Sequence, residues 1–174
     1  MTDWSTHLTT HSGFKFRVRP VRPDDEATLH EFFEHVTPED LRFRFLGTVK
    51  EVGHERLAAM IKVDHVHTES FLAFEREGGP IIAAAMLACD DKLETGEVAV
   101  SLRPDYKNRG IGWELLGHLT RIAETKGVKR LRALEDRSNV AAIRLEKEMG
   151  FSANAYLGDT TMAVLEKALA PAVA

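Results

Sequence analysis

The 174-residue chain has a single cysteine, Cys89, and no long apolar run. A lone thiol cannot form an internal disulfide or supply a cysteine-rich zinc site, and it agrees with a reducing compartment. The longest uncharged apolar stretch, residues 81–89, is far shorter than the roughly 20 residues that a membrane helix needs. The first 13 residues lack the apolar core of a signal peptide. We therefore expect a cytoplasmic protein that does not contact a membrane.

An excess of positive charge is also missing. The chain has 23 Lys and Arg residues against 27 Asp and Glu residues, which gives a formal net charge of −4. Proteins that hold nucleic acid by its phosphates usually present a basic surface, so we expect no nucleic-acid partner. Hydrophobic residues make up 44% of the chain and charged residues 29%. This balance is ordinary for a globular domain and excludes a disordered or fibrous chain.

We expect one domain over residues 14–168, between a flexible N-terminal tail at 1–13 and a C-terminal tail at 169–174. Alternation of apolar and polar residues predicts strands, and apolar residues three and four apart predict helices. Helices are predicted to begin at residues 23 and 37 and to cover 51–62, 112–126 and 139–149, and strands to cover 16–22, 70–75, 80–88, 95–102, 128–134, 156–157 and 160–166. This order indicates a mixed sheet in an α/β or α+β domain.

The segment most informative about function joins strand 95–102 to helix 112–126 and contains Gly110 and Gly112. Glycine allows turn conformations that bring main-chain N–H groups close to a ligand. These donors, with the positive end of the following helix, suit a phosphate or diphosphate. Lys107 and Arg109 would add positive charge at the rim.

Two other glycine-rich loops do not fit this segment. A dinucleotide-binding loop needs a third glycine where Leu115 stands. A P-loop needs Lys and Ser or Thr after Gly117, where the chain has His118 and Leu119. For this motif taken alone, a tight strand-to-helix turn without a ligand stays open.

The pattern from Lys107 to Gly112, a basic residue and then Gly-x-Gly between a strand and a helix, resembles the acetyl-CoA diphosphate loop of the GNAT family of N-acetyltransferases. Asn139 and Ala142 on a helix that ends at Gly150 and Phe151 resemble that family's second signature. The resemblance implies the GNAT fold, a mixed and mostly antiparallel sheet of about six or seven strands with about four or five helices. It also implies acetyl-CoA as cosubstrate and no metal.

The N-terminal half narrows the resemblance. Residues 17–25 and 37–45 resemble the start of the acetyltransferase domain in bacterial protein lysine acetyltransferases of the Pat type, and residues 96–100 resemble the strand with that group's catalytic glutamate. This implies direct attack of a primary amine on acetyl-CoA, with a protein lysine, for instance on an acyl-CoA synthetase, as preferred acceptor. A small amine or antibiotic acceptor, a non-catalytic acyl-CoA-binding sensor and a homodimer stay open.

The resemblance also assigns roles to individual residues. Glu97 becomes the catalytic base, buried in the cleft, which takes the proton of the amine through a water. Main-chain groups of the same strand would hold the pantetheine arm and polarise the thioester carbonyl. The implied cofactor-binding residues are Val98, Ala99, Val100, Lys107, Asn108, Arg109, Gly110, Ile111, Gly112, Trp113 and Asn139. Without such roles, Glu97 is a solvated residue, the valines belong to the core and Asn139 is a helix N-cap.

Three further features of the sequence bear on the proposed reaction. Many GNAT enzymes protonate the leaving thiolate with a tyrosine four residues after the helix alanine, but here Glu146 stands there. We interpret Glu146 as a solvated helix residue, which leaves the general acid unassigned. Phe43 and Arg44 fit either a core face with a solvated arginine or a wall of the substrate entrance. The eight histidines form no metal-binding motif.

Overall fold

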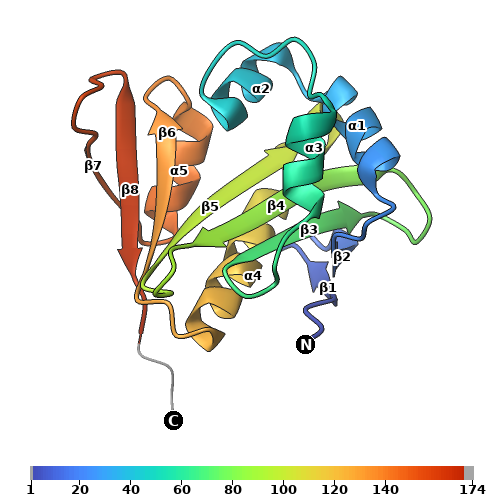
Figure 1. The fold of residues 1–174 in the computed structure, drawn as a ribbon, viewed down its shortest axis with the longest axis horizontal. Helices are drawn as coiled ribbons and strands as arrows, with labels where there is room; N and C mark the ends of the chain where they lie inside the picture. Colours follow the sequence, from blue (N-terminus) through green and yellow to red (C-terminus); the bar gives the residue numbers. More distant parts are fainter. Residues whose placement is uncertain (1, 171–174) are drawn as a thin grey trace.

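A computed structural model describes residues 2–170 of the chain. Within this range one sheet of eight strands has the order β1-β2-β3-β4-β5-β6-β8-β7 (Figure 1). β5 and β6 are parallel, and every other neighbouring pair is antiparallel. The strands are β1 (Thr6–Thr9), β2 (Lys15–Pro20), β3 (Thr68–Phe74), β4 (Ile81–Cys89), β5 (Thr95–Leu102), β6 (Arg130–Asp136), β7 (Ser152–Ala155) and β8 (Met162–Ala168).

Helices cover both faces of the sheet (Figure 1). They are α1 (Glu26–His35), α2 (Pro38–Phe45), α3 (His54–Ile61), α4 (Ile111–Thr125) and α5 (Val140–Glu148), with one 3₁₀ turn, η1 (Pro104–Tyr106). The predicted start of α2 is confirmed, because Pro38 is its first residue and Thr37 Oγ1 accepts a hydrogen bond from the Asp40 N–H at 3.1 Å. α1 and α3 pack on one face, and α4 packs on the other.

Two apolar cores hold these layers together. On one face, the stripe of α4 with Leu115, Leu119 and Ile122 is buried against residues such as Leu87 and Leu131 of the sheet. On the other face, Leu29 and Phe32 of α1 and Leu57 of α3 are buried. They belong to one apolar cluster with Leu72 of β3 and Ile81 of β4. α1 and α4 therefore bury the apolar stripes that their sequence spacing predicted.

The sheet opens between its two parallel strands. β5 and β6 pair only from Thr95 to Glu97, and beyond Glu97 they diverge, with α2 above the opening (Figure 1). Close packing at the paired end depends on Gly96, because a Cβ there would lie 2.8 Å from Leu87 Cδ1 and 3.3 Å from Leu131 Cδ2. The position of the opening follows from this short pairing.

The predicted fold class is confirmed, and three expectations at its borders differ. The expected tail over residues 1–13 contains β1, which pairs with β2, while Trp4 and Leu8 pack against the core. The sheet therefore has eight strands rather than six or seven. Residues 156–157 belong to the connection after β7 rather than to a strand. At the other end, Leu169 N–H bonds to Lys129 O at 2.8 Å, and residues 171–174 of the expected tail lie outside the described residues.

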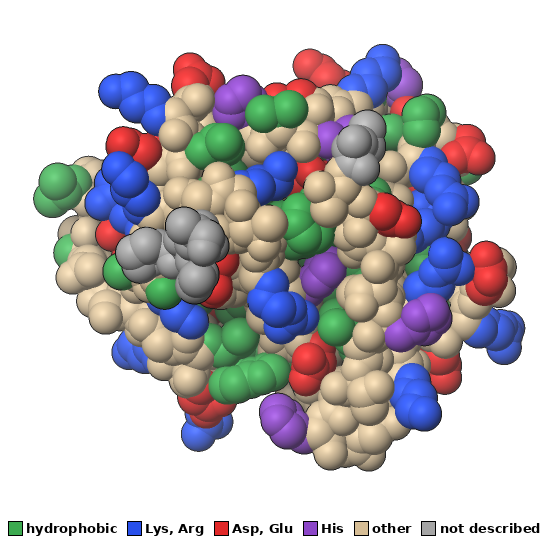
Figure 2. Space-filling model, turned by 90° about the horizontal axis from the view of Figure 1, so that it is seen from below, with side chains coloured by type: hydrophobic (Ala, Val, Ile, Leu, Met, Phe, Trp, Pro, Cys, Tyr) green, Lys and Arg blue, Asp and Glu red, His purple; other side chains and the backbone are tan. Residues whose placement is uncertain are grey.

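The surface mixes charges of both signs. On the face shown in Figure 2, acidic and basic side chains are scattered among hydrophobic ones. Over residues 2–170, the helices are too short or too polar to span a bilayer.

Candidate active site

A cleft of about 350 Å³ occupies the opening between β5 and β6. Its walls are β5, the loop before α4, the start of α4, the end of β6 and α5, and α2 covers one side. All of the predicted site residues except Arg109 line it: Glu97, Val98, Ala99, Val100, Lys107, Asn108, Gly110, Ile111, Gly112, Trp113 and Asn139. Residues as far apart in the chain as Asp40 and Glu146 therefore meet at one cavity.

The loop before α4 presents main-chain donors to this cleft. Asn108 and Gly110 both have left-handed backbones, with φ of 61° and 85°, and no side chain caps the helix. Within the part of the chain that the structure describes, no protein acceptor bonds the main-chain N–H groups of residues 108 to 113. A concave row of free N–H groups at the positive end of a helix is suited to an anion such as a diphosphate.

The two basic side chains of the loop have different surroundings. Lys107 lines the cleft and forms an ion pair with Asp40 of α2, which ties that helix to the loop. The Arg109 guanidinium lies 4.8 Å from the centre of the Tyr106 ring and 5.6 Å from that of Phe14. Arg109 therefore stacks on the rings of Tyr106 and Phe14. Its own side chain is not part of the cleft lining, so the predicted rim charge does not face the cavity.

Glu97 lies on β5 where the pairing with β6 ends, and it lines the cleft. Its side chain is exposed rather than buried, so the expectation of a buried base is wrong. The reason is local: β6 diverges beyond Glu97, which leaves the position open to solvent. An exposed carboxylate at the mouth of the cleft is accessible to an incoming cationic amine.

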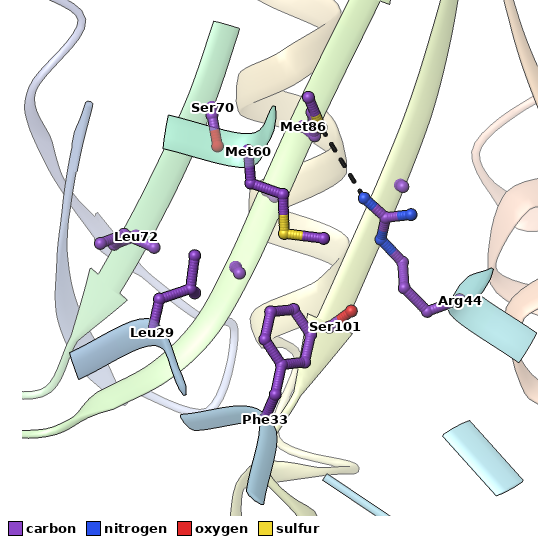
Figure 3. A pocket seen from close by; sticks show the side chains of 11 residues that line it. Leu29, Phe33, Arg44, Met60, Ser70, Leu72, Met86 and Ser101 are labelled. Atoms are coloured by element: carbon purple, nitrogen blue, oxygen red, sulfur yellow. Dashed lines mark hydrogen bonds between the residues drawn. The ribbon is translucent and has the colours of Figure 1, made fainter. Parts of the chain in front are cut away.

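Arg44 of α2 stands between the cleft and a small neighbouring pocket (Figure 3). Its Nη2 lies 3.7 Å from Met86 Sδ, and the pocket beneath it, lined by residues such as Phe33 and Met60, has about 10 Å³ of space, enough for one water. Burial lowers the pKa of Arg44, although the Glu97 carboxylate opposes this shift. Phe43 also lines the cleft, so α2 forms one wall of the opening.

Asn139 links two walls of the site. Its Oδ1 accepts a hydrogen bond from the Ala142 N–H at 3.4 Å and caps α5, while its Nδ2 donates to Glu135 Oε2 of β6 at 3.2 Å. The helix-capping interpretation is therefore confirmed. A contact of Asn139 with the pantetheine arm stays a prediction.

The interpretation of Glu146 as a solvated helix residue is wrong. Glu146 is only 5% exposed, it lines the cleft from α5, and its Oε1 has no hydrogen-bond partner in the described chain. Burial and the neighbouring Glu135 carboxylate raise the pKa of Glu146 to about 10. Burial also raises the pKa of Glu135. The pair therefore holds a proton at neutral pH.

A sequence signal for this burial existed. Ala142, Leu145 and Met149 predict the buried stripe of α5, and Glu146 lies within that stripe, four residues after Ala142. Charged residues are rarely fully buried, so the charge of Glu146 favours a solvated position although its spacing favours a buried one.

Two further groups that could carry chemistry are Tyr106, which lines the cleft, and Cys89, which does not. The Tyr106 O–H donates to Glu75 at 2.7 Å. Cys89 is half-buried, and burial raises the pKa of its thiol. No cluster of three or more potential metal ligands occurs within residues 2–170.

The family model described as the Acetyltransferase (GNAT) family matches residues 29–151. The chain belongs to the GNAT family of acetyltransferases. An acetyltransferase of Pseudomonas aeruginosa is 27% identical over 154 residues, which cover 87% of this chain and 83% of that protein. Acetyltransferase Pat of Mycolicibacterium smegmatis is 33% identical over 82% of this chain, but the match spans only 43% of that longer protein.

Solved structures share the GNAT fold. The GNAT domain of S. lividans PAT has a TM-score of 0.87 at 23% identity, with coverage of 95% of this chain and 97% of that domain. A putative acetyltransferase of Salmonella typhimurium, solved with acetyl-CoA, has a TM-score of 0.68 at 21% identity, with coverage of 89% and 94%. At these identities the likeness shows the fold alone.

The cleft of this GNAT domain fits acetyl-CoA in two respects. The free N–H groups of residues 108 to 113 suit the diphosphate. The edge of β5 beyond Glu97 has no pairing with β6, so its main chain can hydrogen-bond the amides of a pantetheine arm as a neighbouring strand would.

Proposed function

We propose that this protein transfers the acetyl group of acetyl-CoA to a primary amine, with a lysine side chain of another protein as the preferred acceptor. The observation that carries the proposal is the row of main-chain N–H groups at residues 108 to 113, which opens into the same cleft as Glu97. Membership of the GNAT family supports it. The single cysteine agrees with a reducing compartment, and we propose the cytoplasm as its location.

Each wall of the cleft has a task in this reaction. The loop 108–113 binds the diphosphate, and the free edge of β5 positions the thioester so that a main-chain N–H of the strand faces the carbonyl oxygen. An amine with a pKa of about 10.4 is protonated at neutral pH, and Glu97, directly or through a water, takes that proton. The neutral amine then attacks the carbonyl carbon directly. No acetyl-enzyme is expected, because Cys89 is outside the cleft lining.

The choice of acceptor rests on the Pat-like N-terminal half. Residues 37–45 resemble protein lysine acetyltransferases in sequence, and they form α2, whose Phe43 and Arg44 line one side of the cleft. A protein with the name Pat is among the relatives. A lysine is a flexible cation on a long stem, and the exposed Glu97 at the mouth of the cleft offers it a negative partner.

The proposal is tested by incubating the purified protein with acetyl-CoA and a panel of acceptors: an acyl-CoA synthetase, lysine peptides, small amines and aminoglycosides. Release of free thiol is followed, and mass spectrometry locates the acetyl group. We expect thiol release that depends on the acceptor, with acetyl-lysine on the protein. Transfer only to small amines would replace the acceptor. Binding of acetyl-CoA without transfer to any amine would indicate a sensor instead.

A further inference from the structure

Transfer of the acetyl group leaves a thiolate, which needs a proton. Besides the carboxyl pair, six side chains in the cleft lining carry a charge or a hydroxyl: Asp40, Arg44, Glu97, Ser101, Tyr106 and Lys107. Glu97 is the proposed base, and Ser101 is an alcohol, a weaker acid than a thiol. Asp40 and Lys107 neutralise each other in an ion pair, and the Tyr106 O–H already donates to Glu75. A guanidinium such as that of Arg44 does not give up a proton in proteins.

We propose that Glu146 and Glu135 form a proton-sharing carboxyl pair from which Glu146 protonates the sulfur of departing CoA. This inference rests on the proposed acetyl transfer. It assigns the general acid to a residue for which the sequence indicated only a solvated position.

The geometry of the pair favours this role. Glu146 projects from α5 and Glu135 from β6, and both line the wall of the cleft that faces β5. Glu146 is almost fully buried, yet its Oε1 has no partner among the described residues. Such an orphaned oxygen is costly unless a ligand or a proton satisfies it. Ala142 and Leu145 line the cleft beside it, so the carboxyl faces an apolar passage of the kind that a pantetheine arm fills.

The second carboxyl explains why the proton is kept. Glu146 is buried and Glu135 is half-buried beside it. Two adjacent carboxylates so shielded from water cannot both be ionised without a large repulsion, so the pair retains one proton. The Asn139 amide fixes Glu135 by its hydrogen bond at 3.2 Å. Burial, and then the Glu135 charge, raise the pKa of Glu146. The other charged groups that line the cleft are Glu97 on β5, Arg44 on α2 and the ion pair of Asp40 with Lys107, and all of them lie on walls other than β6 and α5.

The atoms balance as follows. The amine nitrogen forms a bond to the carbonyl carbon, the C–S bond breaks, and its electron pair stays on sulfur. Glu97 passes the first proton of the ammonium ion to solvent before the attack and accepts the second as the amide forms, while the sulfur accepts the proton of Glu146, which gives an amide and a free thiol. Solvent then carries a proton from Glu97 back to the carboxyl pair. One proton is released to solvent for each ammonium ion that is acetylated.

The test compares Glu146→Gln and Glu135→Gln with Glu148→Gln as the matched control. Glu148 is exposed on the same helix and pairs with Arg144 at 3.8 Å. Thermal unfolding with and without acetyl-CoA verifies that each variant folds and binds. Two readouts follow: the pH profile of kcat, and the infrared band of a protonated carboxyl in the ligand-free protein at pH 7.

We expect Glu146→Gln to lower kcat at least tenfold, to leave KM for acetyl-CoA unchanged and to remove both the alkaline fall of kcat and the infrared band. Glu135→Gln is expected to shift the alkaline fall to lower pH, because it removes the neighbouring negative charge. Glu148→Gln should match the wild type.

A wild-type kcat and alkaline fall in Glu146→Gln would overturn the role of Glu146. If that variant does not fold, an unshifted profile in Glu135→Gln would overturn it, and a shifted one would support it. If the wild type transfers acetyl to no acceptor, the proposed function fails. The infrared band is read without acetyl-CoA, so its absence in the wild type refutes the shared proton separately.

Discussion

Substitution of Gly110 by alanine separates the stability of the cofactor loop from its ability to bind an anion. Gly110 has φ of 85°, and an added Cβ would lie 3.3 Å from Thr10 Cβ. A left-handed backbone costs an L-residue roughly 1–2 kcal/mol. Gly127, at the end of α4, supplies a matched control: its φ is 81°, and a Cβ there meets nothing within 4 Å. Both variants should therefore lose about 1–2 kcal/mol of stability, which lowers Tm by roughly 2–8 °C in a protein of this size.

Only the Gly110 variant should lose cofactor affinity. Relaxation of the strained loop turns one main-chain N–H away from the diphosphate, and a hydrogen bond to a charged group contributes roughly 1.5–3 kcal/mol. Acetyl-CoA should then bind about 10- to 100-fold more weakly. At a hundred times the wild-type Kd, acetyl-CoA stabilises the wild type by about 2.7 kcal/mol, and Gly110→Ala by only about 0.4–1.4 kcal/mol.

The assay is thermal unfolding of the wild type and the two glycine variants over a titration of acetyl-CoA. The Gly127→Ala variant should keep the wild-type increment in stability, despite its lower Tm. Equal increments in the two variants would refute the reasoning, because the strain would then have no effect on the donors of the loop.

Three further predictions follow. Glu97→Gln should lower kcat at least tenfold while acetyl-CoA still stabilises the fold; steady-state thiol release measures it. Asp25 accepts two hydrogen bonds of 2.8 Å from Arg19; burial raises its pKa, but bonds from Arg19 and the Arg22 N–H outweigh this and lower it. Its contribution to stability is therefore present above about pH 3.9 and lost as pH falls further, and Asp25→Asn should cost about 3 kcal/mol at pH 7 in urea unfolding. The raised pKa of Glu146 has the opposite effect: the unfolded chain ionises above about pH 4.3 while the folded one does not, so wild-type stability falls as pH rises toward 10. Glu146→Gln should remove that fall. The free energy of unfolding of the variant, measured in urea and compared with that of the wild type, should therefore increase from pH 4 to pH 9.

Each of these has a control and a contrary outcome. Glu94→Gln, an exposed residue just before β5 that pairs with Lys129, should keep full activity, and an equally active Glu97→Gln would remove Glu97 from the mechanism. An Asp25→Asn protein with the same acid unfolding midpoint as the wild type would contradict the ion-pair account. Parallel pH–stability curves for Glu146→Gln and the wild type would show that Glu146 is ionised in the folded protein.

The sequence predicted best those elements whose signals are local. The strand that alternation predicts over Thr95–Leu102 has the same bounds as β5. Thr37 and Pro38 correctly predict the start of α2. These signals depend on neighbours within a few residues, so tertiary contacts do not displace them.

The errors concern residues whose state depends on distant partners. Thr6–Thr9 is a strand only because β2 pairs with it and the core accepts Trp4 and Leu8. Glu146 is buried where α5 lines the cleft, next to Glu135 of β6. Gly158 and Asp159 suggest a hairpin turn after a strand at residues 156–157, but Leu157 is 92% exposed in the connection between β7 and β8. Spacing along the chain places Glu146 in the stripe of α5, but it reports neither its neighbour Glu135 nor the contacts of Thr6–Thr9.

The most direct test of the account is a crystal structure of the protein grown with excess coenzyme A. We predict that diphosphate oxygens accept hydrogen bonds from the main-chain N–H groups of residues 108 to 113. The pantetheine arm should run along β5 toward Glu97. A diphosphate bound elsewhere, with those N–H groups bonded to protein acceptors, would contradict it.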